Sequence, residues 1–290
     1  MKLTKFAVGL SALLMLSAGA AEARGLMDFI KLPNAQEEKG SYRSGTIGQS
    51  EALALYSSQQ KQHSFDGCAD LFPEARAINV ASVPAAMKPM ALCSDRFAVV
   101  YSQTSKTPLV VVERLDASQL RDAKGEERTN QFYPDPRIPK SGRAELSDYR
   151  GTGLDRGHQS PAGDAPDHRS MAQSFALSNM VPQNSTNNRT AWSKLETDVR
   201  KFALRAGGSV FVFTGPLFDP GYTTIGDNKV WVPTRLFKLV YDASSKRAWA
   251  YVLPNAETRV ERPMDYATFV KTTGLNLLGD LPVTGTAGRS

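Results

Sequence analysis

The residues best suited to chemistry gather in one short stretch, LDRGHQSPAGD, at positions 154–164. His158 lies there, one of only three histidines in the chain, and a histidine can accept a proton near neutral pH and act as a general base. Arg156 offers a planar cation that suits a phosphate. Gly157 lets the backbone come close to another group, and Asp155 could orient the turn or Arg156. The stretch indicates acid–base chemistry on an anionic substrate, although a lone histidine among polar residues could equally be a surface or capping residue.

A second polar stretch, SNMVPQNSTNNRTAWSKLE at 178–196, carries amide and carboxylate oxygens. These are hard ligands, which favour Mg²⁺-like ions over zinc. Asn188 falls where a helix should begin, so it is a candidate ligand and equally a candidate helix N-cap. On a regular helix, Glu196 would lie about 80° around the axis and about 12 Å along it from Asn188. Both could bind one ion directly only if the helix entry is irregular, whereas Glu196 could reach water bound to the ion.

The elements around these stretches predict one α+β domain with a mainly antiparallel sheet and flanking helices. FAVVYS (97–102) and PLVVVERL (108–115) read as a hairpin. Apolar residues at three- and four-residue spacing predict a helix over 188–206. The segment 121–150 is charged, rich in proline and glycine, and predicted to be irregular. Further strands are predicted at 209–215, 229–234, 235–242 and 247–254, with Pro233 separating the second from the third, and short helices at 51–60 and 264–274.

The N-terminus has the pattern of a Sec-type signal peptide. Lys2 and Lys5 precede an apolar run at 6–16 that is too short to span a bilayer, and Ala21-Glu22-Ala23 forms a cleavage site. We therefore expect cleavage near Ala23, a periplasmic or secreted product, and no membrane association afterwards.

Export also bears on the two cysteines, Cys68 and Cys93. An oxidising compartment would let them form a disulfide, and no CxxC or histidine cluster favours a metal site instead. The chain has 290 residues, a formal charge of +6 and a pI of about 9.3. A modest basic excess is compatible with a polyanionic partner such as nucleic acid, without requiring one.

Taken together, DRGH at 155–158, SNMVPQ at 178–183 and NRTAWSKLE at 188–196 resemble the DNA/RNA non-specific endonuclease family, whose site is a ββα-metal finger. The combination is far more specific than any one motif. The resemblance runs from about residue 92 to 282. It divides the chain into a signal peptide (1–23), an N-terminal extension of unknown role (24–91), an endonuclease domain (92–282) and a tail (283–290).

The resemblance implies an exported, metal-dependent endonuclease that hydrolyses phosphodiester bonds of DNA and RNA with little sequence preference. It also implies one role for each of six residues. His158 matches the general base that activates water, Asn188 the direct protein ligand of Mg²⁺ (or of Mn²⁺ in its place), Glu196 the acid that holds a metal-bound water, Arg156 an arginine that holds the phosphate, Asn179 a supporting asparagine near the histidine, and Arg128 an upstream arginine that contacts the transition state.

Two other functions are compatible with the sequence. The same scaffold could serve a non-catalytic protein for nucleic-acid binding or uptake. A different exported hydrolase could use His63 and His168 together with His158 as zinc ligands, although both of these histidines lie in polar segments that suggest solvated side chains. No G-x-S-x-G or H-E-x-x-H motif supports a serine or zinc hydrolase.

Overall fold

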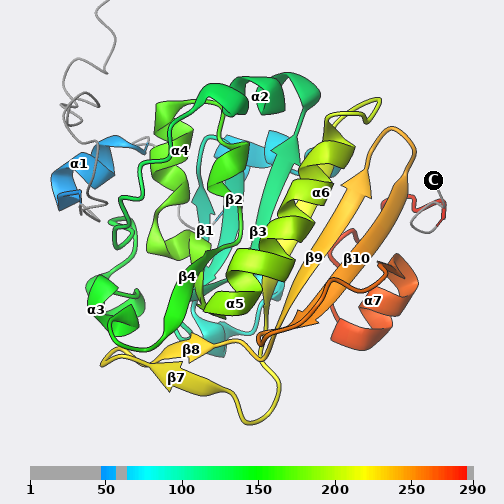
Figure 1. Cartoon of the computed structure of the whole chain (residues 1–290). Coiled ribbons are helices and arrows are strands. Elements are labelled where there is room, and N and C mark those ends of the chain that lie inside the picture. Colours follow the sequence, from blue (N-terminus) through cyan, green and yellow to red (C-terminus); the bar gives the residue numbers. More distant parts are fainter. Residues whose placement is uncertain (1–46, 57–63, 286–290) are drawn as a thin grey trace, which may run out of the picture. The chain divides into compact units, whose positions relative to one another are not determined.

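The computed structural model describes residues 47–56 and 64–285, which fold around a seven-stranded sheet (Figure 1). Every neighbouring pair of strands in this sheet is antiparallel. The predicted α+β class with a mainly antiparallel sheet is therefore confirmed. In spatial order the strands are β1 (Pro89–Cys93), β2 (Phe97–Ser102), β3 (Thr107–Leu115), β6 (Val210–Leu217), β9 (Arg235–Asp242), β10 (Arg247–Pro254) and β11 (Met264–Asp265).

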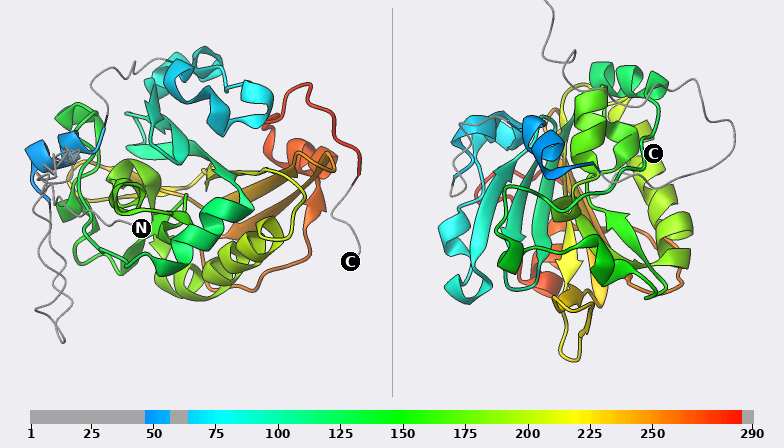
Figure 2. Two further views of the ribbon diagram at one scale, coloured as in Figure 1. Left: turned by 90° about the horizontal axis from the view of Figure 1, so that it is seen from above. Right: turned by 90° about the vertical axis from the view of Figure 1, so that its left-hand side faces the viewer.

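Both faces of the sheet are covered, because alternate side chains of each central strand point to opposite layers. In β6, Phe211 and Phe213 join one apolar cluster, whereas Val210 and Val212 join another on the opposite face. The view from above in Figure 2 shows the N-terminal turns and α7 on one side of the sheet, with α2 and α6 on the other. Two smaller ribbons accompany the sheet, β4 (Leu154–His158) with β5 (Met180–Asn184), and β7 (Thr223–Ile225) with β8 (Val230–Val232).

The helices are short and pack by a few apolar residues each. In α6, for example, Leu195, Val199 and Ala203 are buried at four-residue spacing against the sheet.

The α-helices are α1 (Gln49–Ala54), α2 (Ala117–Asp122), α3 (Leu146–Tyr149), α4 (His168–Ser174), α5 (Ser185–Asn187), α6 (Ser193–Ala203) and α7 (Tyr266–Thr273). The 3₁₀ turns are η2 (Asp66–Leu71), η3 (Pro73–Ala75), η4 (Val80–Ser82), η5 (Ala85–Met87), η6 (Ala123–Gly125), η7 (Lys140–Gly142), η8 (Ala162–Asp164) and η9 (Leu177–Asn179).

Two predicted elements differ from the structure. The strand predicted at 229–234 is only β8, which pairs with β7 instead of joining the main sheet, and Pro233 does separate it from β9. The helix predicted over 188–206 is not regular at its start: α5 passes into a π-helical turn, η10 (Asn188–Trp192), before α6 begins. Apolar spacing could not reveal this wide turn, because it shifts the helix by a single residue. The predicted helix at 51–60 is α1, and its positions 57–60 lie outside the described residues.

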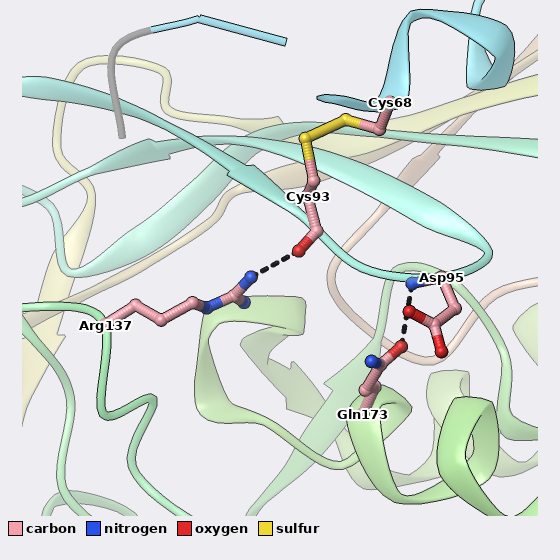
Figure 3. Close-up of a disulfide and its surroundings, with 5 residues drawn as sticks. All are labelled: Cys68, Cys93, Asp95, Arg137 and Gln173. Atoms are coloured by element: carbon pink, nitrogen blue, oxygen red, sulfur yellow. Dashed lines mark hydrogen bonds between the residues drawn. A yellow bond between two sulfur atoms is a disulfide. The ribbon is translucent and has the colours of Figure 1, made fainter. Parts of the chain in front are cut away.

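The predicted disulfide is present. Cys68 in η2 and Cys93 at the end of β1 are joined, with their Cα atoms 5.9 Å apart (Figure 3). The carbonyl oxygen of Cys93 also accepts a hydrogen bond from Nη1 of Arg137 at 2.5 Å. The disulfide therefore joins the N-terminal turns to the edge of the sheet.

The segment before β2 belongs to the same core as the rest of the domain. Phe65, Leu71 and Phe72 are buried on the face of the sheet that carries Phe211 and Phe213, called the rear face below. In addition, β1 pairs with β2 along its whole length. Within the described residues, no helix combines the length and the apolar character needed to cross a membrane.

Candidate active site

The ribbon of β4 and β5 sets the LDRGH stretch beside the MVPQN stretch. Its register places Gly157 opposite Val181 and His158 opposite Met180. A Cβ atom on Gly157 would lie 2.0 Å from Oε1 of Gln183, far inside contact distance. The ribbon therefore closes as it does because residue 157 has no side chain, in agreement with the close approach expected from the sequence.

A cleft of about 970 Å³ opens between this ribbon and the start of the α5–α6 helical segment. Five of the six predicted site residues line it, and Asn179 is the exception. The five come from the irregular segment, from β4, from η10 and from α6, so the fold brings distant parts of the chain together. They are Arg128, Arg156, His158, Asn188 and Glu196.

His158 ends β4, is 8% exposed, and packs against two aromatic rings. Its ring centroid lies 5.8 Å from that of Phe132 and 5.0 Å from that of Phe175, which it meets edge-on. The buried Nε2 atom has no hydrogen-bond partner among the described residues. Burial, reinforced by the positive charges of Arg128 and Arg156, holds the pKa of His158 well below its usual 6.5. The imidazole is therefore neutral at neutral pH, with a nitrogen able to accept a proton.

The two candidate arginines stack on the same two rings. The guanidinium carbon of Arg156 lies 4.0 Å from the ring centroid of Phe132, and that of Arg128 lies 5.0 Å from that of Phe175. Burial lowers the pKa of both groups, yet arginine stays protonated at any physiological pH. Two fixed cations thus flank the imidazole, held by contacts that leave most of their N–H donors available to an anion.

Asp155 holds Asn188, not Arg156 as the sequence had suggested. Its Oδ2 atom accepts hydrogen bonds from Nδ2 of Asn188 and Nε of Arg189, each at 2.9 Å, and its Oδ1 atom accepts one from Nη2 of Arg189 at 2.8 Å. A carboxylate only accepts hydrogen bonds, so the amide nitrogen of Asn188 must face it. The amide oxygen is consequently turned away from Asp155 and is available as a hard ligand.

The π-helical turn brings Asn188 and Glu196 to one cleft despite their separation in the sequence. Asn188 opens this turn, and Glu196 lies in the first turn of α6. Both line the cleft, and the helix entry is irregular, which is the condition under which the sequence allowed both to face one ion. Burial raises the pKa of the partly buried Glu196 to about 7, and the positive charge of Lys238 opposes this shift. A cation in the cleft would favour its ionised form further.

Asn179 lies behind the cleft and braces the turn that follows His158. Its side chain is fully buried. Its Oδ1 atom accepts from the backbone N–H of Ser160, and Nδ2 donates to the carbonyl oxygens of Ser160 and Ser174, all at 2.9 Å. Its own carbonyl accepts the N–H of Gln159 at 3.0 Å. These contacts suit a positioning residue that holds the backbone, away from any substrate in the cleft.

A buried group of charged residues beneath the cleft was missed by the sequence analysis. Glu113 on β3 accepts a hydrogen bond from the Ser160 hydroxyl at 2.7 Å, and burial, reinforced by Asp164, raises the pKa of Glu113 to about 8. Lys238 on β9 donates to the Thr214 hydroxyl at 2.8 Å. The signal was the presence of Glu113 and Lys238 within two largely apolar strands, PLVVVERL and RLFKLVYD, because a strand buried on both faces has little room for a charged side chain.

His168, the other histidine within the described residues, does not join His158. His168 begins α4, is well exposed, and places Nδ1 2.9 Å from Oε2 of Glu126, outside the cleft lining. His63 lies outside the described residues. In the part of the chain that the structure describes, no three His, Cys, Asp or Glu side chains gather as metal ligands.

Comparison with protein families matches residues 75–282 to the model described as DNA/RNA non-specific endonuclease. The match begins before residue 92, where the sequence resemblance was first apparent. Among curated proteins, "Nuclease 1, mitochondrial" of Schizosaccharomyces pombe is 34% identical over 207 residues, covering 63% of this chain and 64% of that protein. "Nuclease C1" of Cunninghamella echinulata var. echinulata is 36% identical over 185 residues, covering 59% and 73% respectively.

Human "Endonuclease G, mitochondrial" is 35% identical over 185 residues, covering 59% of this chain and 62% of that protein. The chain thus spans less than two thirds of the length of several relatives. Among solved structures, a chain of the crystal structure described as the EndoG/EndoGI complex matches with a TM-score of 0.62 and 28% identity, covering 69% of this chain and 91% of that one.

These relatives correct the predicted location. A periplasmic or secreted product was expected, but several proteins similar to this chain are named as mitochondrial nucleases. The prediction depended on residues 1–23, which lie outside the described residues. Its weakness is physical: basic residues near the start of a chain occur in mitochondrial as well as secretory targeting segments, so they do not distinguish the two destinations.

Proposed function

The chain belongs to the DNA/RNA non-specific endonuclease family, and we propose that it is an endonuclease that hydrolyses phosphodiester bonds of DNA and RNA with little sequence preference. One observation carries the proposal. A neutral imidazole, two stacked arginines and an outward-turned amide oxygen line the same cleft. Each suits one requirement of the reaction, namely a base, charge to stabilise the phosphoryl group, and a ligand for a divalent cation.

His158 acts as the general base. A phosphodiester is an anion and repels hydroxide, so hydrolysis at neutral pH needs a group that takes the proton from water as it attacks phosphorus. The depressed pKa keeps His158 neutral, and the residue lines the cleft in which the phosphate would bind. General-base catalysis contributes typically about 10²- to 10⁴-fold to the rate.

Arg156 and Arg128 bind the phosphate and stabilise the charge that it gathers in the transition state. Their guanidinium groups are stacked on Phe132 and Phe175 before substrate arrives, so little reorganisation is needed during the reaction. Asn179 fixes the backbone turn that follows the base.

The cleft fits a hard divalent cation, Mg²⁺ or Mn²⁺ in its place. The Asn188 amide oxygen would be the direct protein ligand, because the amide nitrogen is held by Asp155, and Glu196, in the same cleft, would hold water bound to the ion. Bound there, the ion would supply positive charge to the phosphoryl group and the departing 3′ oxygen, worth several kcal/mol. Amide and carboxylate oxygens with solvent are the donor set such ions prefer.

The substrate is recognised mainly through its backbone. The cleft lining includes five arginines, and arginine contacts to phosphate position a nucleic acid without reading its bases. Binding should therefore tolerate any sequence and weaken steeply as salt rises.

The test is cleavage of plasmid DNA and of RNA in Mg²⁺ buffer by the wild type and by His158→Ala. We expect His158→Ala to lose activity while keeping a native circular dichroism spectrum. His168→Ala is the matched control, since His168 is exposed and lies outside the cleft lining, and it should keep wild-type activity. Full activity in His158→Ala would refute the proposed base, and tight nucleic-acid binding by the wild type without cleavage would favour a non-catalytic binding protein.

A further inference from the structure

The segment Ile47–Tyr56 lies before the family match, which begins at residue 75, yet it packs against the wall that holds the candidate base. Ala52 of α1 is 1% exposed and Leu55 is 5% exposed. Both belong to an apolar cluster with Tyr133 and Phe175. Figure 1 shows α1 beside α4.

Hydrogen bonds fix the end of this segment to α4. The carbonyl oxygen of Leu55 accepts from Nε2 of Gln173 at 2.7 Å and from Nε of Arg169 at 3.1 Å. The other end of the Gln173 amide accepts the backbone N–H of Asp95 at 2.8 Å (Figure 3). One buried glutamine thus connects α1 to the turn between β1 and β2.

Tyr56 adds a second attachment. Its hydroxyl lies 2.7 Å from the hydroxyl of Tyr133, and the guanidinium carbon of Arg137 lies 3.6 Å from its ring centroid. Tyr133 is fully buried and bridges to Ala176. The attachment therefore reaches the two chain segments that carry Phe132 and Phe175.

Those two rings are what positions the catalytic groups. The rings of Phe132 and Phe175 lie 4.8 Å apart in an edge-to-face pair. His158 packs against both, and Arg156 and Arg128 each stack on one of them. With Nε2 of His158 unpartnered among the described residues, the orientation of the imidazole depends heavily on this packing.

We propose that Ile47–Tyr56 is a positioning segment of the candidate active site, in which Leu55 and Tyr56 hold Phe175 and Tyr133 so that His158 and its two arginines keep their places. The inference rests on the proposed function. Leu55 touches no substrate and acts only through the aromatic wall. Packed cores transmit such changes, because a void on one side of a ring removes its contacts there.

The experiment uses the full chain and compares Leu55→Ala with Leu278→Ala. Leu278 is 3% exposed and belongs to the cluster on the rear face of the sheet, away from the cleft. The two variants therefore make the same chemical change at similarly buried positions. Leu53→Ala adds a control on α1 itself, since Leu53 is 46% exposed.

At a temperature well below the melting points of all variants, we expect kcat for plasmid cleavage to fall on the order of tenfold in Leu55→Ala, below the 100-fold that a displacement of about 1 Å can cost. KM should change by a smaller factor than kcat, because both arginines keep their positive charge even where their positions shift. Leu55→Met, which conserves volume, should restore most of kcat. Leu53→Ala and Leu278→Ala should keep wild-type kcat.

Wild-type kcat in a folded Leu55→Ala, or an equal loss of kcat in Leu278→Ala, would overturn the inference. If Leu55→Ala does not fold, Tyr56→Phe replaces it: this variant removes one hydroxyl, should lower kcat a few-fold, and would overturn the inference by matching the wild type.

The proposed function can fail separately, and the positioning can then still be measured. Because the chain has only three histidines, the NMR signals of the His158 ring can be assigned with His158→Ala. These signals should shift in Leu55→Ala and stay in place in Leu278→Ala, whether or not the protein cleaves nucleic acid. Unshifted signals in Leu55→Ala would overturn the positioning role, whereas a wild type without nuclease activity would refute only the proposed function.

Discussion

Asp155→Asn tests how the cleft prepares its cation ligand. In the structure, the Asn188 amide nitrogen donates a hydrogen bond to the Asp155 carboxylate, so the amide oxygen faces away from Asp155. An asparagine at position 155 could donate as well as accept, so the Asn188 amide could turn either way at little cost. The variant should therefore bind Mg²⁺ more weakly while its fold is unchanged.

The magnitude follows from the bond that is lost. A hydrogen bond to a charged group contributes about 1.5–3 kcal/mol, and every 1.4 kcal/mol corresponds to about tenfold in an equilibrium constant. Part of that energy is recovered by the new amide–amide contact. We therefore expect the Mg²⁺ concentration for half-maximal cleavage to rise by about tenfold.

The assay is cleavage rate against Mg²⁺ concentration, with Mn²⁺ binding measured directly by calorimetry. Arg189→Gln is the control, because it removes the other partner of Asp155 and keeps the bond to Asn188. The Arg189 side chain is 72% exposed, so losing its ion pair with Asp155 should cost little stability. An unchanged Mg²⁺ dependence in Asp155→Asn, or the same rise in Arg189→Gln, would refute the reasoning.

Three further predictions concern pH, stability and phosphate binding. The pKa of His158 is held well below 6.5, so kcat/KM should stay level as pH falls through 6.5 and decline only in more acidic buffer; a decline centred at 6.5 or above would contradict the buried neutral base. The pKa of Glu113 is raised from 4.5 to about 8, so between these pH values the folded state keeps a proton that the unfolded chain has released. The stability that this group contributes therefore falls as pH rises through this range. Denaturant titrations should show a flatter pH dependence of stability for Glu113→Gln, and equal pH dependence in the variant and the wild type would count against the prediction. Arg156→Lys keeps the charge but loses the flat stacked fork on Phe132, so kcat should fall at least tenfold in plasmid assays, and a wild-type rate would show that charge alone suffices.

The sequence predicted those parts of the fold that repeat a local pattern. Nearly continuous apolar runs located β2, β3, β6, β9 and β10, since a strand between two packed layers must be apolar along its length. The same reasoning overlooked β4 and β5, because LDRGH carries polar side chains into the cleft and MVPQN mixes polar with apolar residues. Their pairing depends on Gly157 and Gln183 meeting across the ribbon, a contact that no local pattern encodes.

Motifs predicted the residues of the candidate site, but they did not predict the aromatic residues that hold those residues in position. His158, Arg156, Asn188 and Glu196 lie in stretches that resemble a known family, and Arg128 was placed with them by analogy; all five line one cleft. The aromatic wall of Phe132 and Phe175 gave no signal, because single aromatic residues in a chain are most often ordinary core. Only the tertiary fold shows that they contact the base and the arginines together.

Degradation of DNA and RNA by the purified protein, with EDTA added and then Mg²⁺ restored, tests the central claim most directly. The account predicts that both polymers are cut, that EDTA stops the reaction, that Mg²⁺ restarts it, and that the products carry 5′-phosphate ends because the 3′ oxygen departs. Cleavage that continues in EDTA, or products ending in 3′-phosphate, would contradict a cation at Asn188 acting with the His158 base.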